Sequence, residues 1–310
     1  MEGAFLADVG GTTTRLAIER GGRPEKIEEI ANDSVSDFIE AAAAYLRRHG
    51  LRPQRAVFAF AGPIGADSVT LTNRAWSLRF ADLADRLGVA GVDALNDFEA
   101  VAWALPALPP DQLRAIGSAV RPGRGAKVAC GPGTGLGVSA LVPTPQGWCA
   151  IAGEGGHVAF GPSLDDELDV FARLRQSFGW IEAETLLCGP GLERLHVALH
   201  PDAPPAHAGE IVEGALRGKP ACASTVALFV RLLGRFAGDL ALTFKATGGV
   251  YLAGGVARKL DGLLDGTVFR TAFEHHPPFG SLLATIPTWL ILHPQPGLLG
   301  CATYAEHLRA

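Results

Sequence analysis

The sequence has no long hydrophobic run and no cluster of basic residues. None of its apolar stretches approaches the ~20 residues that a membrane-spanning helix requires. Its N-terminus has neither the basic region nor the apolar run of a targeting signal. The formal net charge is −5, and basic residues occur only in short groups such as Arg47-Arg48. These absences argue against a membrane protein and a nucleic-acid-binding surface, and we expect a cytoplasmic protein.

Cysteine is sparse and follows no metal-binding or disulfide pattern. The five residues are scattered without a Cys-x-x-Cys pair: Cys130, Cys149, Cys188, Cys222 and Cys301. This spacing excludes a zinc knuckle and gives no sign of a disulfide framework. We expect these residues to be small buried side chains in a reducing compartment.

Two common nucleotide-binding motifs are also absent. The sequence contains neither a Walker motif ending in Gly-Lys-Ser/Thr nor a Gly-x-Gly-x-x-Gly fingerprint. The P-loop and Rossmann modes of binding therefore lack their characteristic residues.

What the sequence does contain is a set of glycine-rich turns beside apolar strands. The first lies within residues 7–18, where an apolar segment breaks at Gly10-Gly11 and resumes after three threonines. Glycines let the backbone approach a phosphate, Thr12 and Thr13 can donate hydrogen bonds, and Asp8 can hold a hydrated cation. The alternative is an ordinary Gly-Gly turn with a polar tip.

Two further turns strengthen the phosphate-binding interpretation. Residues 131–142 repeat the pattern of a glycine and threonine tip followed by an apolar strand, which suggests two related lobes. Gly254-Gly255 follows a strand near residues 249–251 and opens onto a helix through residues 258–260. Three such turns can surround one nucleotide.

Asn96-Asp97 stands where a predicted strand at 92–95 runs into a predicted helix at 98–105. A carboxylate at this position lies at the carboxyl edge of a sheet, which is the usual ligand site of an open α/β fold. The helix N-terminus keeps it ionised, so it can accept a proton from an alcohol. Alternatively, Asn96 or Asp97 only caps the helix, and both roles are compatible.

Glu154 and His157 lie in the glycine-rich bend 153–157, after a predicted strand. Polar side chains exposed on a tight bend suit a polyol pocket, because carboxylates and imidazoles can each fix one sugar hydroxyl. A metal site is the alternative, but a third ligand at recognisable spacing is missing. An exposed histidine without a role remains a further alternative.

The pattern of apolar and turn residues predicts an alternating α/β chain with a boundary in the Pro- and Gly-rich stretch 106–125. We expect a small lobe at 1–108, a large lobe at 109–297 and a last helix, within 298–310, that packs back on the small lobe. Further expected elements are a helix over 35–49, strands over 56–61 and 69–76, a helix over 77–87 closed by Gly88, and helical structure at 112–116. In the large lobe we expect strands at 127–130, 137–142 and 147–152, helices after Ser163 and Gly189, and a long helix over about 224–244.

Several short motifs follow one another along nearly the whole chain. They are Asp8-Val9-Gly10-Gly11-Thr12, Ala61-Gly62-Pro63, Leu71-Thr72-Asn73 with Trp76, Asn96-Asp97-Phe98, Gly131 to Gly137, Glu154-Gly155-Gly156-His157, Cys188 to Leu192 and Ala253-Gly254-Gly255. Taken in this order, the motifs resemble those of bacterial ATP-dependent glucokinases. The cysteine-rich zinc motif of the related repressor and sugar-kinase family is absent.

The resemblance implies a two-lobed hexokinase/actin-like (ribonuclease H-like) α/β fold with a cleft between a smaller N-terminal and a larger C-terminal lobe. It implies phosphorylation of the glucose 6-hydroxyl by ATP and Mg²⁺, with Asp97 as general base, in a protein that is commonly a homodimer. The implied sugar-binding residues are Asn96, Asp97, Gly135, Glu154, His157 and Glu184, with Glu182 as the competitor of Glu184. The implied nucleotide-binding residues are Asp8, Val9, Gly10, Gly11, Thr12, Thr13, Gly133, Thr134, Gly254 and Gly255, and Asp8 is expected to hold Mg²⁺ through water.

Two other functions compete with a glucose kinase. One is a kinase of the same fold that acts on another hexose, since epimers differ only in the direction of one hydroxyl. The other is a non-catalytic sugar or nucleotide sensor. Asp97 together with intact glycine turns favours an enzyme.

Overall fold

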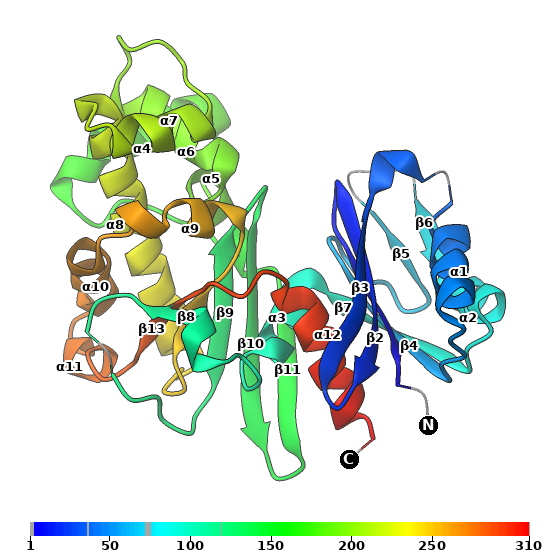
Figure 1. Ribbon diagram of the computed structural model, residues 1–310. Helices are drawn as coiled ribbons and strands as arrows, with labels where there is room; N and C mark the ends of the chain where they lie inside the picture. The colour runs from blue at the N-terminus through cyan, green and yellow to red at the C-terminus, as the bar shows by residue number, and fades with distance from the viewer. Residues whose placement is uncertain (1–2, 36, 72–75, 119, 310) are drawn as a thin grey trace. The chain divides into compact units, whose positions relative to one another are not determined.

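The structure is a computed structural model that describes residues 3–35, 37–71, 76–118 and 120–309. It divides into two compact units (Figure 1). Unit 1 comprises the residues up to Pro109 together with those from His293 onward, and unit 2 comprises Pro110–Leu292. Unit 1 is therefore built from two separate parts of the chain.

The main sheet of unit 1 has five strands in the order β3-β2-β1-β4-β7. Strands β1, β2 and β3 are antiparallel neighbours, whereas β4 pairs parallel to β1 and β7 parallel to β4. A separate two-stranded sheet is formed by β5 and β6. The strands are β1 (Phe5–Val9), β2 (Thr13–Arg20), β3 (Arg23–Ala31), β4 (Arg55–Phe60), β5 (Ser68–Thr70), β6 (Ser77–Arg79) and β7 (Gly91–Asn96).

The sheet of unit 2 has six strands in the order β11-β10-β9-β12-β13-β8. Here β9, β10 and β11 are antiparallel neighbours, β12 pairs parallel to β9 and to β13, and β8 is antiparallel to β13. The strands are β8 (Leu113–Ala115), β9 (Lys127–Pro132), β10 (Leu136–Thr144), β11 (Gly147–Gly153), β12 (Val250–Leu252) and β13 (Thr288–Ile291).

The two sheets repeat one topology. In each unit a three-stranded antiparallel meander is extended by two parallel strands, so β3-β2-β1-β4-β7 corresponds to β11-β10-β9-β12-β13. The turn between β1 and β2 corresponds to the turn between β9 and β10, and these are the two glycine-threonine tips of the sequence. The predicted α/β fold with two related lobes is confirmed.

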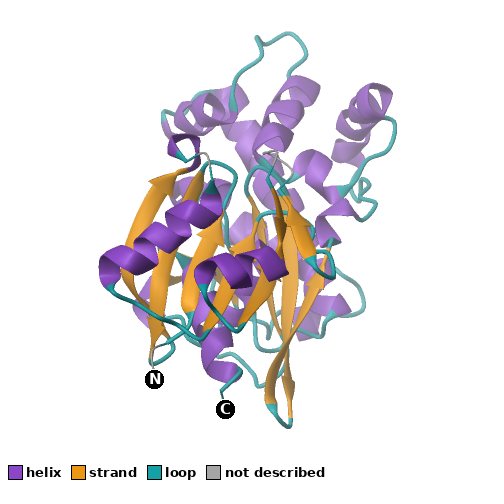
Figure 2. Cartoon of the chain, turned by 90° about the vertical axis from the view of Figure 1, so that its right-hand side faces the viewer, coloured by secondary structure: helices purple, strands orange, loops and turns teal. Residues whose placement is uncertain are grey.

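Four helices cover the sheet of unit 1. Figure 2, which views the right-hand side of Figure 1, shows helices lying in front of the strands. The core under α1 and α2 contains aromatic pairs such as Phe5–Tyr45 and Phe5–Phe58. Helix α12 packs against α3, β1 and β4. The helices are α1 (Phe38–His49), α2 (Phe80–Leu87), α3 (Asp97–Ala104) and α12 (Pro296–His307).

Unit 2 packs its helices around the long helix α8, which contributes Phe229, Leu233 and Phe236 to a second hydrophobic core. The helices are α4 (Leu168–Phe178), α5 (Ala183–Leu186), α6 (Gly189–Leu199), α7 (Ala208–Leu216), α8 (Pro220–Thr243), α9 (Gly255–Lys259), α10 (Gly266–Glu274) and α11 (Gly280–Leu283). Within the described parts of the chain, none of the helices has both the length and the hydropathy of a membrane span.

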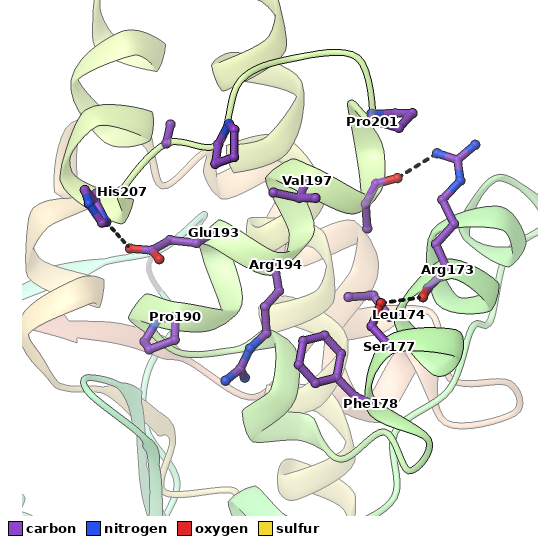
Figure 3. Close-up of a pocket in the computed structure, with 13 residues that line it drawn as sticks. Arg173, Leu174, Ser177, Phe178, Pro190, Glu193, Arg194, Val197, Pro201 and His207 are labelled. Carbon is purple, nitrogen blue, oxygen red and sulfur yellow. Dashed lines mark hydrogen bonds and ion pairs between the residues drawn. The ribbon is translucent and has the colours of Figure 1, made fainter.

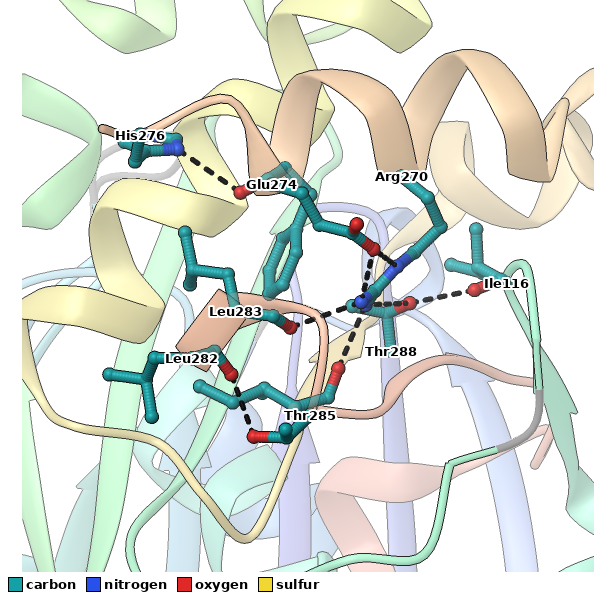
Figure 4. Close-up of polar contacts among 10 residues, drawn as sticks. Ile116, Arg270, Glu274, His276, Leu282, Leu283, Thr285 and Thr288 are labelled. Atoms are coloured by element: carbon teal, nitrogen blue, oxygen red, sulfur yellow. Dashed lines mark hydrogen bonds and ion pairs between the residues drawn. The ribbon is translucent and has the colours of Figure 1, made fainter. Parts of the chain in front are cut away.

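One arginine of α10 joins several of these elements. Arg270 donates to the carboxylate of Glu274 at 2.8 Å and to the carbonyl oxygens of Leu283 and Ile286 at 3.1 and 2.8 Å (Figure 4). It also reaches the Thr288 hydroxyl, which donates to the carbonyl of Ile116. The guanidinium thus gives a partner to the Ile286 carbonyl before β13, and it adds a second donor to the Leu283 carbonyl, which also accepts from the Ile286 N–H at 3.0 Å.

The structure corrects three local expectations. Residues 77–79 form β6, paired with β5, so the expected helix begins only at Phe80, although it ends at Gly88 as expected. Residues 113–115 form strand β8 because they pair with β13. Of the cysteines, all free, Cys149 is exposed and Cys222 is half-buried. The expected strand over 69–76 overlaps β5 (Ser68–Thr70), but its residues 72–75, which include Thr72 and Asn73 of the Leu71-Thr72-Asn73 segment, lie outside the described residues.

Candidate functional site

The first glycine turn forms a braced hairpin tip. Asp8 and Val9 end β1, residues 10–12 form the turn, and Thr13 begins β2. The buried side chain of Asn32 donates to the Gly10 carbonyl at 2.8 Å and accepts from the Thr14 hydroxyl at 2.7 Å, while its backbone N–H donates to the Thr12 carbonyl at 2.8 Å. Asn32 therefore holds both sides of the tip in place.

Asp8 is the acidic group at this tip. Its side chain is about one fifth exposed, and burial raises the pKa of its carboxyl while the Arg15 guanidinium, 3.8 Å away, opposes that rise. Arg15 also donates to Glu29 at 2.9 Å. The Asp8 charge is thus only partly compensated by its neighbours, which suits a carboxylate that meets a cation.

Asn96 and Asp97 lie at the junction of β7 and α3. The Asn96 side chain accepts from the N–H of Phe98 at 2.9 Å, and Glu99 accepts from the Asn96 N–H at 3.3 Å, so Asn96 caps the helix. The Asp97 carboxylate also accepts from the Phe98 N–H at 2.9 Å. The capping role considered for Asn96 is confirmed, and Asp97 is held at the helix N-terminus.

The register of the sheet places this junction on the same edge as the hairpin tip. Val9 is paired with Phe60, and Phe60 with Asn96, through parallel ladders. The end of β1 and the end of β7 are therefore two strands apart, or about 10 Å. Unit 1 brings Asp8 and Asp97 to one carboxyl edge.

In unit 2 the second and third glycine turns meet. Gly254 has φ +94°, and a Cβ there would lie 2.5 Å from the carbonyl oxygen of Pro132. Gly131 approaches the backbone of Ala253 so closely that a Cβ would overlap it. The N–H of Gly189, at the start of α6, donates to the Gly133 carbonyl at 2.9 Å. Gly133, Thr134, Gly254 and Gly255 thus belong to one glycine-rich cluster.

Glu184 lies next to this cluster. Its carboxylate accepts from the N–H of Leu136 at 2.7 Å, and a Cβ on Gly135 would lie 2.5 Å from its Oε2. The glycine at 135 therefore makes the room that this carboxylate occupies.

His157 pairs with the other candidate glutamate. His157 Nδ1 lies 2.9 Å from Glu182 Oε1, and one ligand atom each of His157, Glu182 and Glu184 lies within 4.8 Å of the others. The hydrogen bond with Glu182 is the main reason why the pKa of His157 is raised above its ordinary value. Both of the competing glutamates, Glu182 and Glu184, therefore lie near His157.

Glu154 precedes the short 3₁₀ turn at Gly155–His157, and its carbonyl accepts from the His157 N–H at 3.0 Å. Gly156 is buried against Leu136, whose carbonyl a Cβ would overlap. The bend 154–157 therefore lies against the start of β10, beside Glu184 and Gly135.

A separate cavity in unit 2 contains none of the predicted site residues. It has a volume of about 660 Å³ and lies among α4, α6 and the segment before α7 (Figure 3). Arg194 lies over the ring of Phe178 there, and Glu193 contacts His207.

Sequence reasoning missed Asn32, the Glu182–His157 pair and the Leu136 N–H that binds Glu184. Asn32 is far along the chain from Gly10, and no local motif marks its contact with the turn. The sequence at 182–184 indicated two candidate carboxylates. It could not show that Glu182 contacts His157 whereas Glu184 accepts from the Leu136 N–H.

Comparison with known proteins agrees with the motif order. The glucokinase family model matches residues 5–308. A curated glucokinase of Allorhizobium ampelinum is 38% identical over 97% of this chain and 91% of its own, and one of Sinorhizobium medicae is 39% identical with the same coverage. A crystal structure of glucokinase from an Antarctic psychrotroph is 28% identical, with a TM-score of 0.91 and 98% of each chain covered. The chain belongs to the glucokinase family.

Proposed function

We propose that the protein transfers the γ-phosphoryl group of ATP to the 6-hydroxyl of D-glucose. The observation that carries this proposal is the shared carboxyl edge of unit 1, where register places the Asp8–Thr13 hairpin and Asp97 two strands apart. A phosphate-binding turn and a carboxylate base at such a separation suit transfer between a nucleotide and an alcohol. Family membership supports glucose as the acceptor and ATP as the donor.

In this proposal Asp97 accepts the proton of the sugar 6-hydroxyl. Its carboxylate needs no raised pKa, because in a loose phosphoryl-transfer transition state the proton leaves late, as the new phosphorus–oxygen bond forms. The N-terminus of α3 favours the ionised form that this role requires. Asn96, which caps the same helix, orients a neighbouring hydroxyl.

The remaining sugar contacts come from unit 2. Glu184 is the sugar-binding glutamate, supported by its fixed position against Gly135 and the Leu136 N–H. His157 and Glu154 bind further hydroxyls. Glu182 is the partner of His157 Nδ1 and sets the orientation of that ring.

The glycine turns hold the nucleotide. The backbone of residues 8–13 and the cluster of Gly133, Thr134, Gly135, Gly254 and Gly255 provide N–H donors and close approach for phosphate oxygens. Asp8 fits Mg²⁺ held through water, since it is an oxygen ligand with only a long contact to Arg15. When bound, Mg²⁺ neutralises charge on the phosphates. That the protein is a cytoplasmic homodimer is part of the proposal and rests on the family resemblance.

The test is a coupled assay of ADP production with ATP, Mg²⁺ and a panel of hexoses, in wild type and Asp97→Asn. We expect turnover with glucose and a loss of about 10²- to 10⁴-fold in kcat in the variant, with glucose binding retained. Asparagine keeps the oxygen that accepts from the Phe98 N–H, and the cap formed by Asn96 is untouched, so helix α3 should stay intact.

Asp111→Asn, at an exposed carboxylate of unit 2, is the matched control and should keep full activity. An active Asp97→Asn variant would contradict the base assignment. Preference for another hexose would keep the mechanism and change the substrate. Sugar binding without turnover in the wild type would favour the sensor.

A further inference from the structure

The first turn of helix α12 lies against the carboxylate of Asp8. Gly297 is the second residue of this helix, after Pro296. A Cβ at Gly297 would lie 2.8 Å from Asp8 Oδ2 and 3.0 Å from its Cγ. These separations are shorter than packed non-bonded atoms allow, so only glycine leaves room for this carboxylate where it stands.

The alternation of β1 explains why Asp8 points this way. Phe5, Ala7 and Val9 belong to the core under α1 and α2. Asp8 therefore faces the opposite side of the strand, and helix α12 packs against β1. Cys301 lies one turn further along α12, with its Sγ 3.8 Å from the Ala7 carbonyl oxygen, so the helix follows the strand closely.

The N-terminus of α12 also has a suitable charge. Proline at the first position has no N–H, and the amides of the next two residues are first-turn donors without an intrahelical acceptor. The partial positive charge of this end favours a carboxylate beside it. Shape and electrostatics thus act on the same side chain.

We propose that Gly297 is a positioning residue for Asp8, and that the first turn of α12 completes the site for the Mg²⁺-bound nucleotide. The inference rests on the proposed function, which assigns Asp8 to Mg²⁺ through water. It gives a residue near the C-terminus a role in a site that the sequence motifs place entirely earlier in the chain.

The test compares Gly297→Ala with Gly209→Ala. Gly209 is likewise the second residue of a helix, α7, but a Cβ there meets nothing within 4 Å. The dissociation constant of ADP is measured by calorimetry with Mg²⁺ and with EDTA. In the wild type, Mg²⁺ should tighten ADP binding, and we call the ratio of the two dissociation constants the Mg²⁺-dependent gain. In Gly297→Ala we expect near-wild-type ADP affinity in EDTA and a Mg²⁺-dependent gain about 10- to 100-fold smaller than in the wild type. Gly209→Ala should match the wild type.

A double-mutant cycle separates positioning from general damage to the fold. In an Asp8→Ala background the carboxylate that the new Cβ meets is gone, so Gly297→Ala should change neither the melting temperature nor the Mg²⁺-dependent gain further. The cycle remains informative if Gly297→Ala alone does not fold. The double variant should then still fold, with the melting temperature of Asp8→Ala. A full Mg²⁺-dependent gain in Gly297→Ala, or effects that add in the double variant, would overturn the inference.

Failure of the proposed function gives a different result. If Asp8→Ala itself keeps the whole Mg²⁺-dependent gain, the assignment of Asp8 is wrong. If Asp8→Ala loses the gain and Gly297→Ala keeps it, only the positioning role of Gly297 is wrong.

Discussion

At the scale of single residues, the histidines of unit 2 differ in their surroundings. Glu182 raises the pKa of His157, mainly by a hydrogen bond to Nδ1. Burial lowers the pKa of His196, whose Nδ1 lies 2.9 Å from the Thr225 hydroxyl. The two imidazoles should therefore titrate on opposite sides of the ordinary histidine value, and only His157 depends on Glu182.

We predict that Glu182→Gln lowers the pKa of His157 and leaves that of His196 unchanged, as followed by the NMR shifts of the imidazole protons. Because the pKa of His157 is higher in the folded than in the unfolded chain, its protonation stabilises the fold. This contribution is complete at pH values below the unfolded-state pKa and is lost as pH rises through the folded-state pKa. The KM for glucose should rise over the same pH range, and this inflection should move down in the variant. An unchanged pKa of His157 in Glu182→Gln would contradict the hydrogen bond between these two side chains.

At the scale of elements, α12 fits its surroundings through small residues. Gly300 packs against α3 so closely that a Cβ would overlap the carbonyl of Ala100. The following Cys301 and Ala302 are fully buried. Little space is left for added volume along this face of the helix.

Gly300→Ala should therefore lower the free energy of unfolding by about 1–3 kcal/mol, since the added methyl forces α12 and α3 apart. Gly209→Ala, in an open helix position, should stay within about 0.5 kcal/mol of wild type. Urea denaturation followed by fluorescence measures both. Equal free energies of unfolding for the two variants would contradict this prediction, because α3 and α12 would then accommodate the added methyl group without a loss of stability.

The same scale shows what the sequence can and cannot predict. The hairpin tips and the strand-to-helix junction at Asn96-Asp97 were predicted, because turn glycines and capping residues act on their own neighbours. Strand β8 was missed because its pairing partner, β13, lies far along the chain. The contacts of Gly10 with Asn32 and of Asp8 with Gly297 were missed for the same reason.

At the scale of the whole molecule, the last described residues close unit 1. Arg309 donates to the buried carboxylate of Glu19 on β2 at 2.5 Å, and the Gly22 N–H donates to it at 2.8 Å. Burial opposes ionisation of Glu19, but these hydrogen bonds outweigh it and lower the pKa. The end of the chain is thereby attached to one of its first strands.

A lowered carboxyl pKa gives stability that is present above the unfolded value and is lost as pH falls through the folded value. We predict that Arg309→Ala lowers the urea midpoint at pH 7, because Glu19 is then buried without its cation. The difference from wild type should shrink as pH falls below about 4.5, where Glu19 becomes protonated in the unfolded chain. Arg217→Ala, at an exposed helical pair with Glu213, is the control and should change little. A difference that is constant with pH would exclude this linkage.

The discontinuity of unit 1 has a consequence for synthesis on the ribosome. Unit 2 is one continuous stretch, Pro110–Leu292, and all of its strands and helices have been translated before α12 emerges. Unit 1 gains the helix that packs on β1 and β4 only after α12 has left the exit tunnel. The segment made second can thus fold first, while the N-terminal sheet still lacks the helix over β1 and exposes that surface to chaperones.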